Sequence, residues 1–137
     1  MRFFRLREFP EEAWRVTLKK ENFFYAITSS TSNPDRAAVA LVLASTALDA
    51  GHDVLVWFVT EGALLARRGA AEKMTSPVFG NLNDLIQKII HFGGHLAVCG
   101  TCCAFYKIDE KDFADGFEKR TAAWAVESSI GRNCLTF

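Results

Sequence analysis

The chain has 137 residues, which is an ordinary length for one domain. Half of its residues are hydrophobic and it has only 9 glycines and 3 prolines, which excludes a disordered, collagen-like or low-complexity protein. Its formal net charge is zero, so the chain as a whole has no electrostatic attraction for nucleic acid or for an anionic membrane surface. An uncharged chain this rich in apolar residues is expected to self-associate.

The beginning of the chain argues against export and against a membrane span. Residues 1–14 contain no apolar core of a signal peptide, and they carry glutamates, which transit peptides avoid. The longest apolar runs, such as residues 54–59, are far too short to cross a bilayer. We therefore expect a cytoplasmic protein without membrane contact.

Two segments are expected along the chain. Residues 1–21 are mixed in charge and rich in aromatic side chains, which predicts an N-terminal arm that packs on the domain or on a neighbouring subunit. Residues 22–137 contain no repeat, linker or change in composition, so we expect them to form a single domain.

The domain is predicted to begin with a strand and a long helix. Residues 23–28 form a short apolar run that indicates a buried strand. Asn33 is a suitable cap for a helix over residues 34–50, and Gly51 is a suitable end. The middle of this helix, residues 37–44, is apolar on all sides, so we expect it to be covered on both sides, with a second subunit as one candidate cover.

A second strand and a second long helix follow. Residues 54–60 form a continuous apolar run, which is typical of a strand covered on both faces in a parallel sheet. Residues 63–68 have the pattern of a short helix. Asn81 is the expected cap of an amphipathic helix that Gly93 and Gly94 end.

The last third of the chain repeats this alternation. We predict a strand over residues 95–99, a short helix over residues 102–107, and an acidic, polar connection over residues 109–116. A helix over residues 121–130 and a final strand over residues 134–137 complete the chain. Alternating strands and helices predict the α/β class, here a three-layer α/β/α domain with a mostly parallel sheet of about five strands.

The segment from Cys99 to Cys103 is the part of the sequence with evident chemistry. In open α/β sheets, ligands bind beyond the carboxyl ends of the strands, and Cys99 lies at such an end. Cys102 lies near the start of the following helix, where free N–H groups favour a thiolate. We therefore predict Cys99 and Cys102 as catalytic residues, since a thiolate is the nucleophile in both disulfide exchange and sulfur transfer.

The other cysteines and the histidines are assigned ordinary roles. Cys103 and Cys134 are expected to pack as small apolar side chains. A zinc site is not predicted, because zinc usually needs two spaced pairs of ligands and a second pair is missing. The histidines, His52, His91 and His95, are expected to be surface or packing residues, and His95 alone is placed where it could reach the thiols.

No cofactor is predicted from the remaining motifs. The chain has no glycine-rich phosphate loop, no G-x-S-x-G elbow and no HExxH sequence. The hydroxyl-rich residues 29–33 precede a helix, where an anion can bind, but an ordinary turn and helix cap explain them better.

With these residues laid out, the sequence resembles the DsrE/DsrF-like family, which includes the sulfur-relay subunits TusB, TusC and TusD. The resemblance lies in the Asp35-Arg36-Ala37 helix start, the Gly51-His52-Asp53-Val54 strand start, the Val98-Cys99-Gly100-Thr101-Cys102 turn and the final Leu135-Thr136-Phe137 strand. It implies a homo-oligomer, such as a trimer or hexamer, that holds a persulfide on Cys99 and exchanges sulfur with donor and acceptor proteins. Cys102 then matches the second cysteine of the C-x-x-C members.

Three functions follow from these observations. The leading hypothesis is a sulfurtransferase or sulfur carrier, in which Cys99 takes sulfur and Cys102 modulates or resolves the persulfide. The second is a cytoplasmic dithiol oxidoreductase that uses Cys99 and Cys102 as a redox pair. The third is a non-catalytic oligomeric binding module in which the cysteines only pack.

Overall fold

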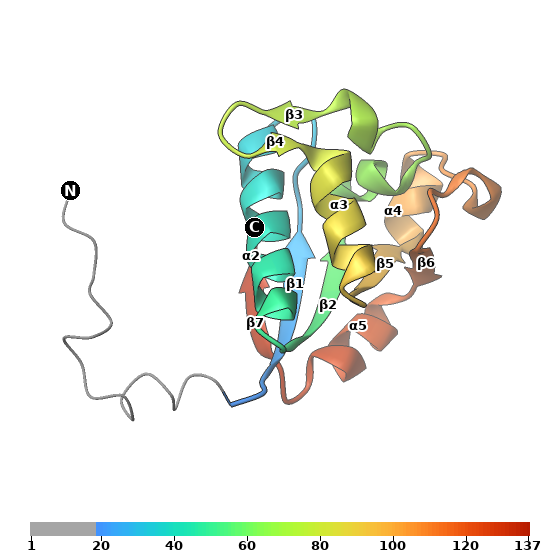
Figure 1. Ribbon diagram of the computed structural model, residues 1–137. Coiled ribbons are helices and arrows are strands. Elements are labelled where there is room, and N and C mark those ends of the chain that lie inside the picture. Colours follow the sequence, from blue (N-terminus) through green and yellow to red (C-terminus); the bar gives the residue numbers. More distant parts are fainter. Residues whose placement is uncertain (1–18) are drawn as a thin grey trace.

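The computed structural model describes residues 19–137, in which helices cover both faces of a parallel β-sheet (Figure 1). The predicted N-terminal arm lies outside the described residues, except for residues 19–21. The strands of the sheet are β1 (Asn22–Ile27), β2 (Asp53–Phe58), β5 (His95–Cys99), β6 (Phe117–Arg120) and β7 (Asn133–Thr136). Their order across the sheet is β6-β5-β2-β1-β7, and all neighbouring strands are parallel.

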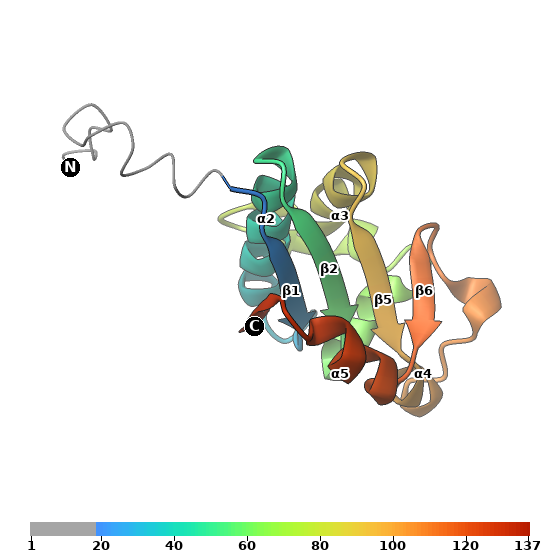
Figure 2. The ribbon, with the colours of Figure 1, turned by 90° about the horizontal axis from the view of Figure 1, so that it is seen from below.

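The α-helices of residues 19–137 lie on both faces of the sheet and at its carboxyl end (Figure 2). Helices α2 and α3 pack against each other on one face, and α5 crosses the other face, as Figure 2 shows. Helix α4 follows β5 directly at the carboxyl end of the sheet. The helices are α2 (Pro34–Asp49), α3 (Leu82–His91), α4 (Gly100–Phe105) and α5 (Ala122–Ser129). This arrangement is the predicted three-layer α/β/α fold.

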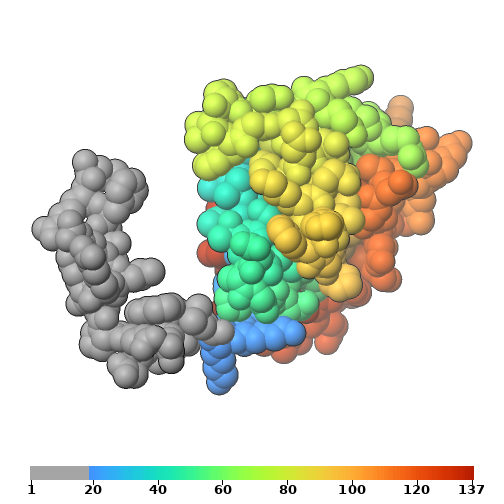
Figure 3. All heavy atoms as spheres, in the orientation of Figure 1, coloured from blue at the N-terminus to red at the C-terminus, as the bar shows by residue number. Residues whose placement is uncertain are grey.

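Shorter elements connect these layers. They include the 3₁₀ helices η3 (Thr60–Ala66), η4 (Ala71–Lys73) and η5 (Glu110–Asp112). A small antiparallel pair consists of β3 (Thr75–Ser76) and β4 (Gly80–Asn81). The β3–β4 pair lies above α2 and α3 in Figure 3.

Strand β2 shows why a continuous apolar sequence was needed at the centre of the sheet. Val56 and Phe58 pack into the cluster under α2 and α3, whereas Leu55 and Trp57 pack into the cluster under α5. All four side chains are buried, as expected for a strand covered on both faces. Trp57 contacts Trp124 of α5, with ring centroids 5.8 Å apart, so α5 is fixed on the sheet by aromatic packing.

Helix α2 is packed on two sides by other parts of the same chain. One side lies on the sheet and another packs on α3, while an outward stripe with Arg36, Leu43 and Thr46 is exposed. The two-sided cover expected for this apolar helix is thus supplied by the sheet and α3. The predicted cap is confirmed, because the Asn33 side chain accepts a hydrogen bond from the Arg36 N–H at 3.1 Å.

The sequence-based prediction was wrong at some connections. Strand β6 lies directly after the predicted polar connection and was missed, because only Phe117 of its four residues is buried and the rest read as a polar loop. Helix α4 begins at Gly100 rather than at Cys102, and the predicted short helix at 63–68 is the 3₁₀ helix η3, which begins at Thr60. Within residues 19–137, no helix has the length and apolar character that crossing a membrane would require.

Candidate active site

The carboxyl ends of three neighbouring strands lie side by side at one end of the sheet. Ile27 at the end of β1 pairs with Phe58 at the end of β2, and Phe58 pairs with Val98 near the end of β5. The segments that follow these strands therefore lie together, as is typical of ligand sites in parallel sheets. They contribute a hydroxyl-rich turn, the start of η3, and the cysteine turn.

Cys99 is the last residue of β5 and the residue that precedes α4. Its side chain is buried, in the same apolar cluster as Leu55 and Trp57. Its own side chain does not cap the helix. Cys99 therefore lies where the sequence predicts it, at the end of a strand and directly before a helix.

Cys102 lies in the first turn of α4, and it is partly exposed. Its side chain packs against the cluster that contains Cys99, so the fold brings the two predicted site residues together. The backbone N–H of Thr60 donates a hydrogen bond to the Cys102 sulfur, with 3.1 Å between nitrogen and sulfur. Thr60 has a φ of 53°, a left-handed conformation that is unfavourable for a β-branched residue.

Two opposing effects act on the ionisation of Cys102. Burial raises the pKa of its thiol, and the Cys99 thiol beside it raises the pKa further. The hydrogen bond from the Thr60 N–H acts in the opposite direction and is outweighed. Because the pKa lies above its ordinary value, Cys102 is a neutral thiol at neutral pH.

The remaining cysteines differ from each other. Cys103 is buried in the core under α2 and α3, and burial raises its pKa to about 11. Its predicted role as a packing residue is confirmed. The same prediction was wrong for Cys134, which is exposed because all four residues of the edge strand β7 are left uncovered by the part of the chain that the structure describes.

Glu61 forms a hydrogen-bonded clamp with the hydroxyl-rich turn after β1. One carboxylate oxygen accepts hydrogen bonds from the Ser30 hydroxyl at 3.2 Å, the Thr31 hydroxyl at 2.8 Å and the Ser32 N–H at 2.6 Å. The other oxygen accepts from the Ser32 hydroxyl, and the Glu61 backbone carbonyl accepts from Ser30 at 2.8 Å. Partial burial alone would raise the pKa of this carboxyl, but the hydrogen bonds outweigh it and lower the pKa to about 2.

This clamp was not found from the sequence. The turn was expected to be an ordinary helix cap, and Asn33 does cap α2, but the hydroxyl groups before it bind an internal carboxylate. The sequence feature that could have indicated it is a glutamate directly after the second strand. Because the two strands are parallel, this position lies beside the turn that follows the first strand. We name Glu61 together with Ser30, Thr31 and Ser32 the Glu61 clamp.

The three histidines lie at the other end of the sheet. His95 is the exposed first residue of β5, as expected for a surface residue, and the length of the strand separates it from Cys99, so it does not reach the thiols. His52 immediately precedes β2, and His91 ends the helix that leads to β5. Among residues 19–137, no group of three or more histidine, cysteine or acidic side chains is arranged to hold a metal ion.

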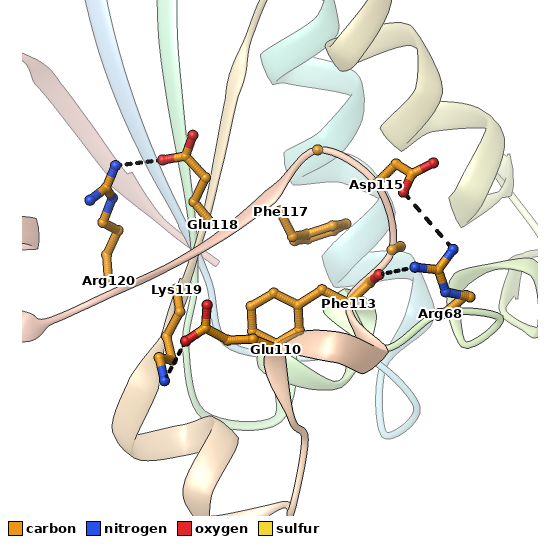
Figure 4. Close-up of a pocket in the computed structure, with 10 residues that line it drawn as sticks. Arg68, Glu110, Phe113, Asp115, Phe117, Glu118, Lys119 and Arg120 are labelled. Carbon is orange, nitrogen blue, oxygen red and sulfur yellow. Dashed lines mark hydrogen bonds and ion pairs between the residues drawn. The ribbon is translucent and has the colours of Figure 1, made fainter.

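A separate hollow of about 490 Å³ lies beside β6 (Figure 4). It is lined by charged side chains that pair with one another: Arg68 with Asp115 at 3.9 Å, Lys119 with Glu110 at 2.7 Å and Arg120 with Glu118 at 2.6 Å. No cysteine lines it. The predicted site residues Cys99 and Cys102 therefore lie outside this hollow.

Two curated proteins are similar to this chain in sequence. Uncharacterized protein MJ0760 of Methanocaldococcus jannaschii is 32% identical over 111 residues, which cover 81% of this chain and 40% of that protein. The chain therefore spans less than half the length of this relative. Uncharacterized protein MJ0989 of the same organism is 31% identical over 119 residues, which cover 84% of this chain and 98% of that protein.

Two solved structures share the fold at low sequence identity. The ychN protein from E. coli superposes with a TM-score of 0.62 and 15% identity, covering 86% of this chain and 99% of that one. Protein MTH1491 of Methanobacterium thermoautotrophicum superposes with a TM-score of 0.63 and 13% identity, covering 86% and 100% of the two chains. The DsrE/DsrF-like family matches residues 21–130, which include every strand of the sheet except β7. The chain belongs to the DsrE/DsrF-like family.

Proposed function

We propose that the chain is a sulfur carrier that holds a persulfide on Cys99 and passes the sulfur to a partner. The observation that carries this proposal is the pair of thiols at the carboxyl end of β5, one at the start of α4 and the other held by the Thr60 N–H. Membership of a family associated with sulfur relay supports it. All four cysteines are free thiols, which agrees with a role in a reducing compartment such as the cytoplasm.

The loading step requires a persulfide donor, R–S–SH. The Cys99 thiolate attacks the outer sulfur of the donor, a new sulfur–sulfur bond forms on Cys99, and the donor leaves as the thiolate RS⁻. The product is Cys99–S–SH, and no external oxidant or reductant is consumed. Transfer to an acceptor thiolate is the same reaction in the opposite direction.

Cys102 determines whether the loaded sulfur survives. A Cys102 thiolate that attacked the inner sulfur would form a Cys99–Cys102 disulfide and release HS⁻. The raised pKa of Cys102 keeps it protonated at neutral pH, which slows this loss. The same property disfavours the dithiol oxidoreductase, because that function needs a thiolate at the more accessible of the two cysteines.

We also propose that the chain acts as a homo-oligomer, a trimer or a hexamer, that meets separate donor and acceptor proteins. The support is the set of large apolar side chains exposed on α5 and β7. Val126, Ile130 and Leu135 are 63%, 70% and 44% exposed. Exposed apolar side chains favour association, because a partner that covers them removes their apolar surface from water. The native mass of the purified chain tests this, and a monomeric mass would contradict it.

The experiment is sulfane loading followed by mass spectrometry. The protein is incubated with a small-molecule persulfide, and the added sulfur is located by fragmentation. We expect one added sulfur atom on Cys99, no loading in Cys99→Ser, and retained loading in Cys102→Ser. The matched control is Cys134→Ser, which changes an exposed cysteine far from the turn and should load normally. Equal loading in Cys99→Ser would contradict the proposal, and the absence of any loading would favour the binding module.

A further inference from the structure

We propose that Glu61 is a positioning residue for the sulfur site: its clamp holds the Thr60 backbone so that the Thr60 N–H stays directed at the Cys102 sulfur. This inference rests on the proposed function for its biological meaning. Its geometry is independent of that function, because it concerns the contact between η3 and α4.

The first step is the contact itself. The Thr60 nitrogen is 3.1 Å from the Cys102 sulfur. This hydrogen bond joins the turn after β2 to the cysteine turn. Thr60 adopts a φ of 53°, which threonine rarely accepts without support from its surroundings. Something in the structure therefore has to stabilise this backbone conformation.

The second step identifies the support. The Thr60 hydroxyl donates a hydrogen bond to the Thr28 carbonyl at 2.8 Å, which fixes one side of the turn on the end of β1. Glu61, the next residue, is held on its carbonyl and on both carboxylate oxygens by the turn at Ser30–Ser32. The Thr60 hydroxyl and the carbonyl and carboxylate of Glu61 are thus anchored to the segment after β1.

The third step is the close packing beneath the clamp. A Cβ atom on Gly62 would lie 2.1 Å from the Ile27 carbonyl oxygen, so η3 lies directly on the end of β1. Residues 60–62 therefore have little room to shift. A change in the Glu61 side chain removes the clamp hydrogen bonds and leaves the Thr60 hydroxyl bond and the packing of Gly62 in place.

The direction of the effect separates positioning from simple charge. If Glu61 acted on Cys102 through its negative charge, its replacement by glutamine would lower the pKa of Cys102. If Glu61 acts by holding the Thr60 N–H, the replacement weakens a donor to the thiolate and raises the pKa of Cys102. The two roles predict shifts of opposite sign.

The Glu61 substitution leaves the other ionisable groups near Cys102 unchanged. On the same segment as Cys102, these groups are the thiols of Cys99 and Cys103. On the segment after β2, the charged group is Arg67, which follows η3 and donates a hydrogen bond to the Tyr106 carbonyl at 3.0 Å. A shift in Cys102 after the Glu61 substitution is therefore attributable to the clamp.

The test measures iodoacetamide alkylation of the full chain across pH, with each cysteine resolved by fragment-ion mass spectrometry. In Glu61→Gln we expect the Cys102 profile to move to higher pH, with a rate near pH 8 that is about threefold lower than in the unaltered chain. Glu61→Ala should give a larger shift. The matched control is Glu72→Gln, an exposed glutamate on η4 outside the clamp, which should leave the profile unchanged.

Protection of the buried Cys103 reports that each variant is folded. If Glu61→Ala exposes Cys103 to alkylation, Glu61→Gln decides, because glutamine keeps the volume and one hydrogen-bond acceptor. A Cys102 profile that is unmoved, or moved to lower pH, overturns the proposal. Because alkylation needs no sulfur donor, this result is distinct from failure of Cys99 to load sulfur, which would overturn the carrier function alone.

Discussion

The two ends of the parallel sheet are built from the same strands and differ in chemistry and packing. At the carboxyl end, Cys99, Cys102 and the Glu61 clamp lie on segments that contact one another closely. At the amino end lie the histidines and open turns such as Gly51, where an added Cβ would meet no atom within 4 Å. The candidate site therefore lies where the turns are closely packed, and the histidines lie at the opposite end of the sheet.

The largest predicted effect is on folding and comes from Gly62. An added methyl group there would lie 2.1 Å from the Ile27 carbonyl oxygen, so Gly62→Ala should lower the free energy of unfolding by about 3 kcal/mol. The matched variant at the amino end is Gly51→Ala, whose φ of +92° is unfavourable but whose surroundings are open, and we expect about 1 kcal/mol. Urea denaturation of both variants measures this difference. Equal losses would contradict the close packing inferred at the carboxyl end.

A smaller effect is expected in acid, from the Glu61 carboxyl. Its pKa is about 2 in the folded chain against an ordinary 4.5, so ionised Glu61 stabilises the folded state above about pH 4.5. This contribution is lost as the pH falls from about 4.5 towards 2, where the group becomes protonated. Because the side chain is partly solvated, we expect Glu61→Gln to be about 1 kcal/mol less stable near pH 6, with the difference vanishing near pH 2. Urea titrations at several pH values test this, and a constant difference would contradict the assigned pKa.

The smallest predicted effect concerns the amino end. His95→Gln should leave the alkylation profiles of Cys99 and Cys102 unchanged, because the full length of β5 separates His95 from the thiols. The measurement is the same fragment-resolved alkylation across pH. A shift of either profile by His95→Gln would mean that the amino end of the sheet affects the thiols at its carboxyl end, and it would contradict the separation of the two ends.

Much of the fold could be predicted because apolar runs and capping residues are local signals. The continuous run in β2 and the caps Asn33 and Asn81 placed the central strand and both long helices correctly. Edge strand β6 could not be found this way, since an edge strand with a single buried residue has the composition of a loop.

The candidate site was predictable only in part. Cys99 and Cys102 were identified because a thiol pair at a strand end is a signal contained in one short segment. Glu61 was missed because its role depends on the turn at Ser30–Ser32, which is distant in sequence and becomes adjacent only through the β1–β2 register. The exposure of Cys134 depends on which strand forms the edge of the sheet, and composition does not encode that order.

The most direct test of the carrier function follows the fate of sulfur after loading. The persulfide-loaded chain is freed of donor at neutral pH, and released sulfide, the Cys99–Cys102 disulfide and transfer to an added low-molecular-weight thiol are measured together. We predict that the sulfur remains on Cys99 until the thiol is added and is then transferred. Rapid release of sulfide with formation of the Cys99–Cys102 disulfide, before any acceptor is added, would contradict the account.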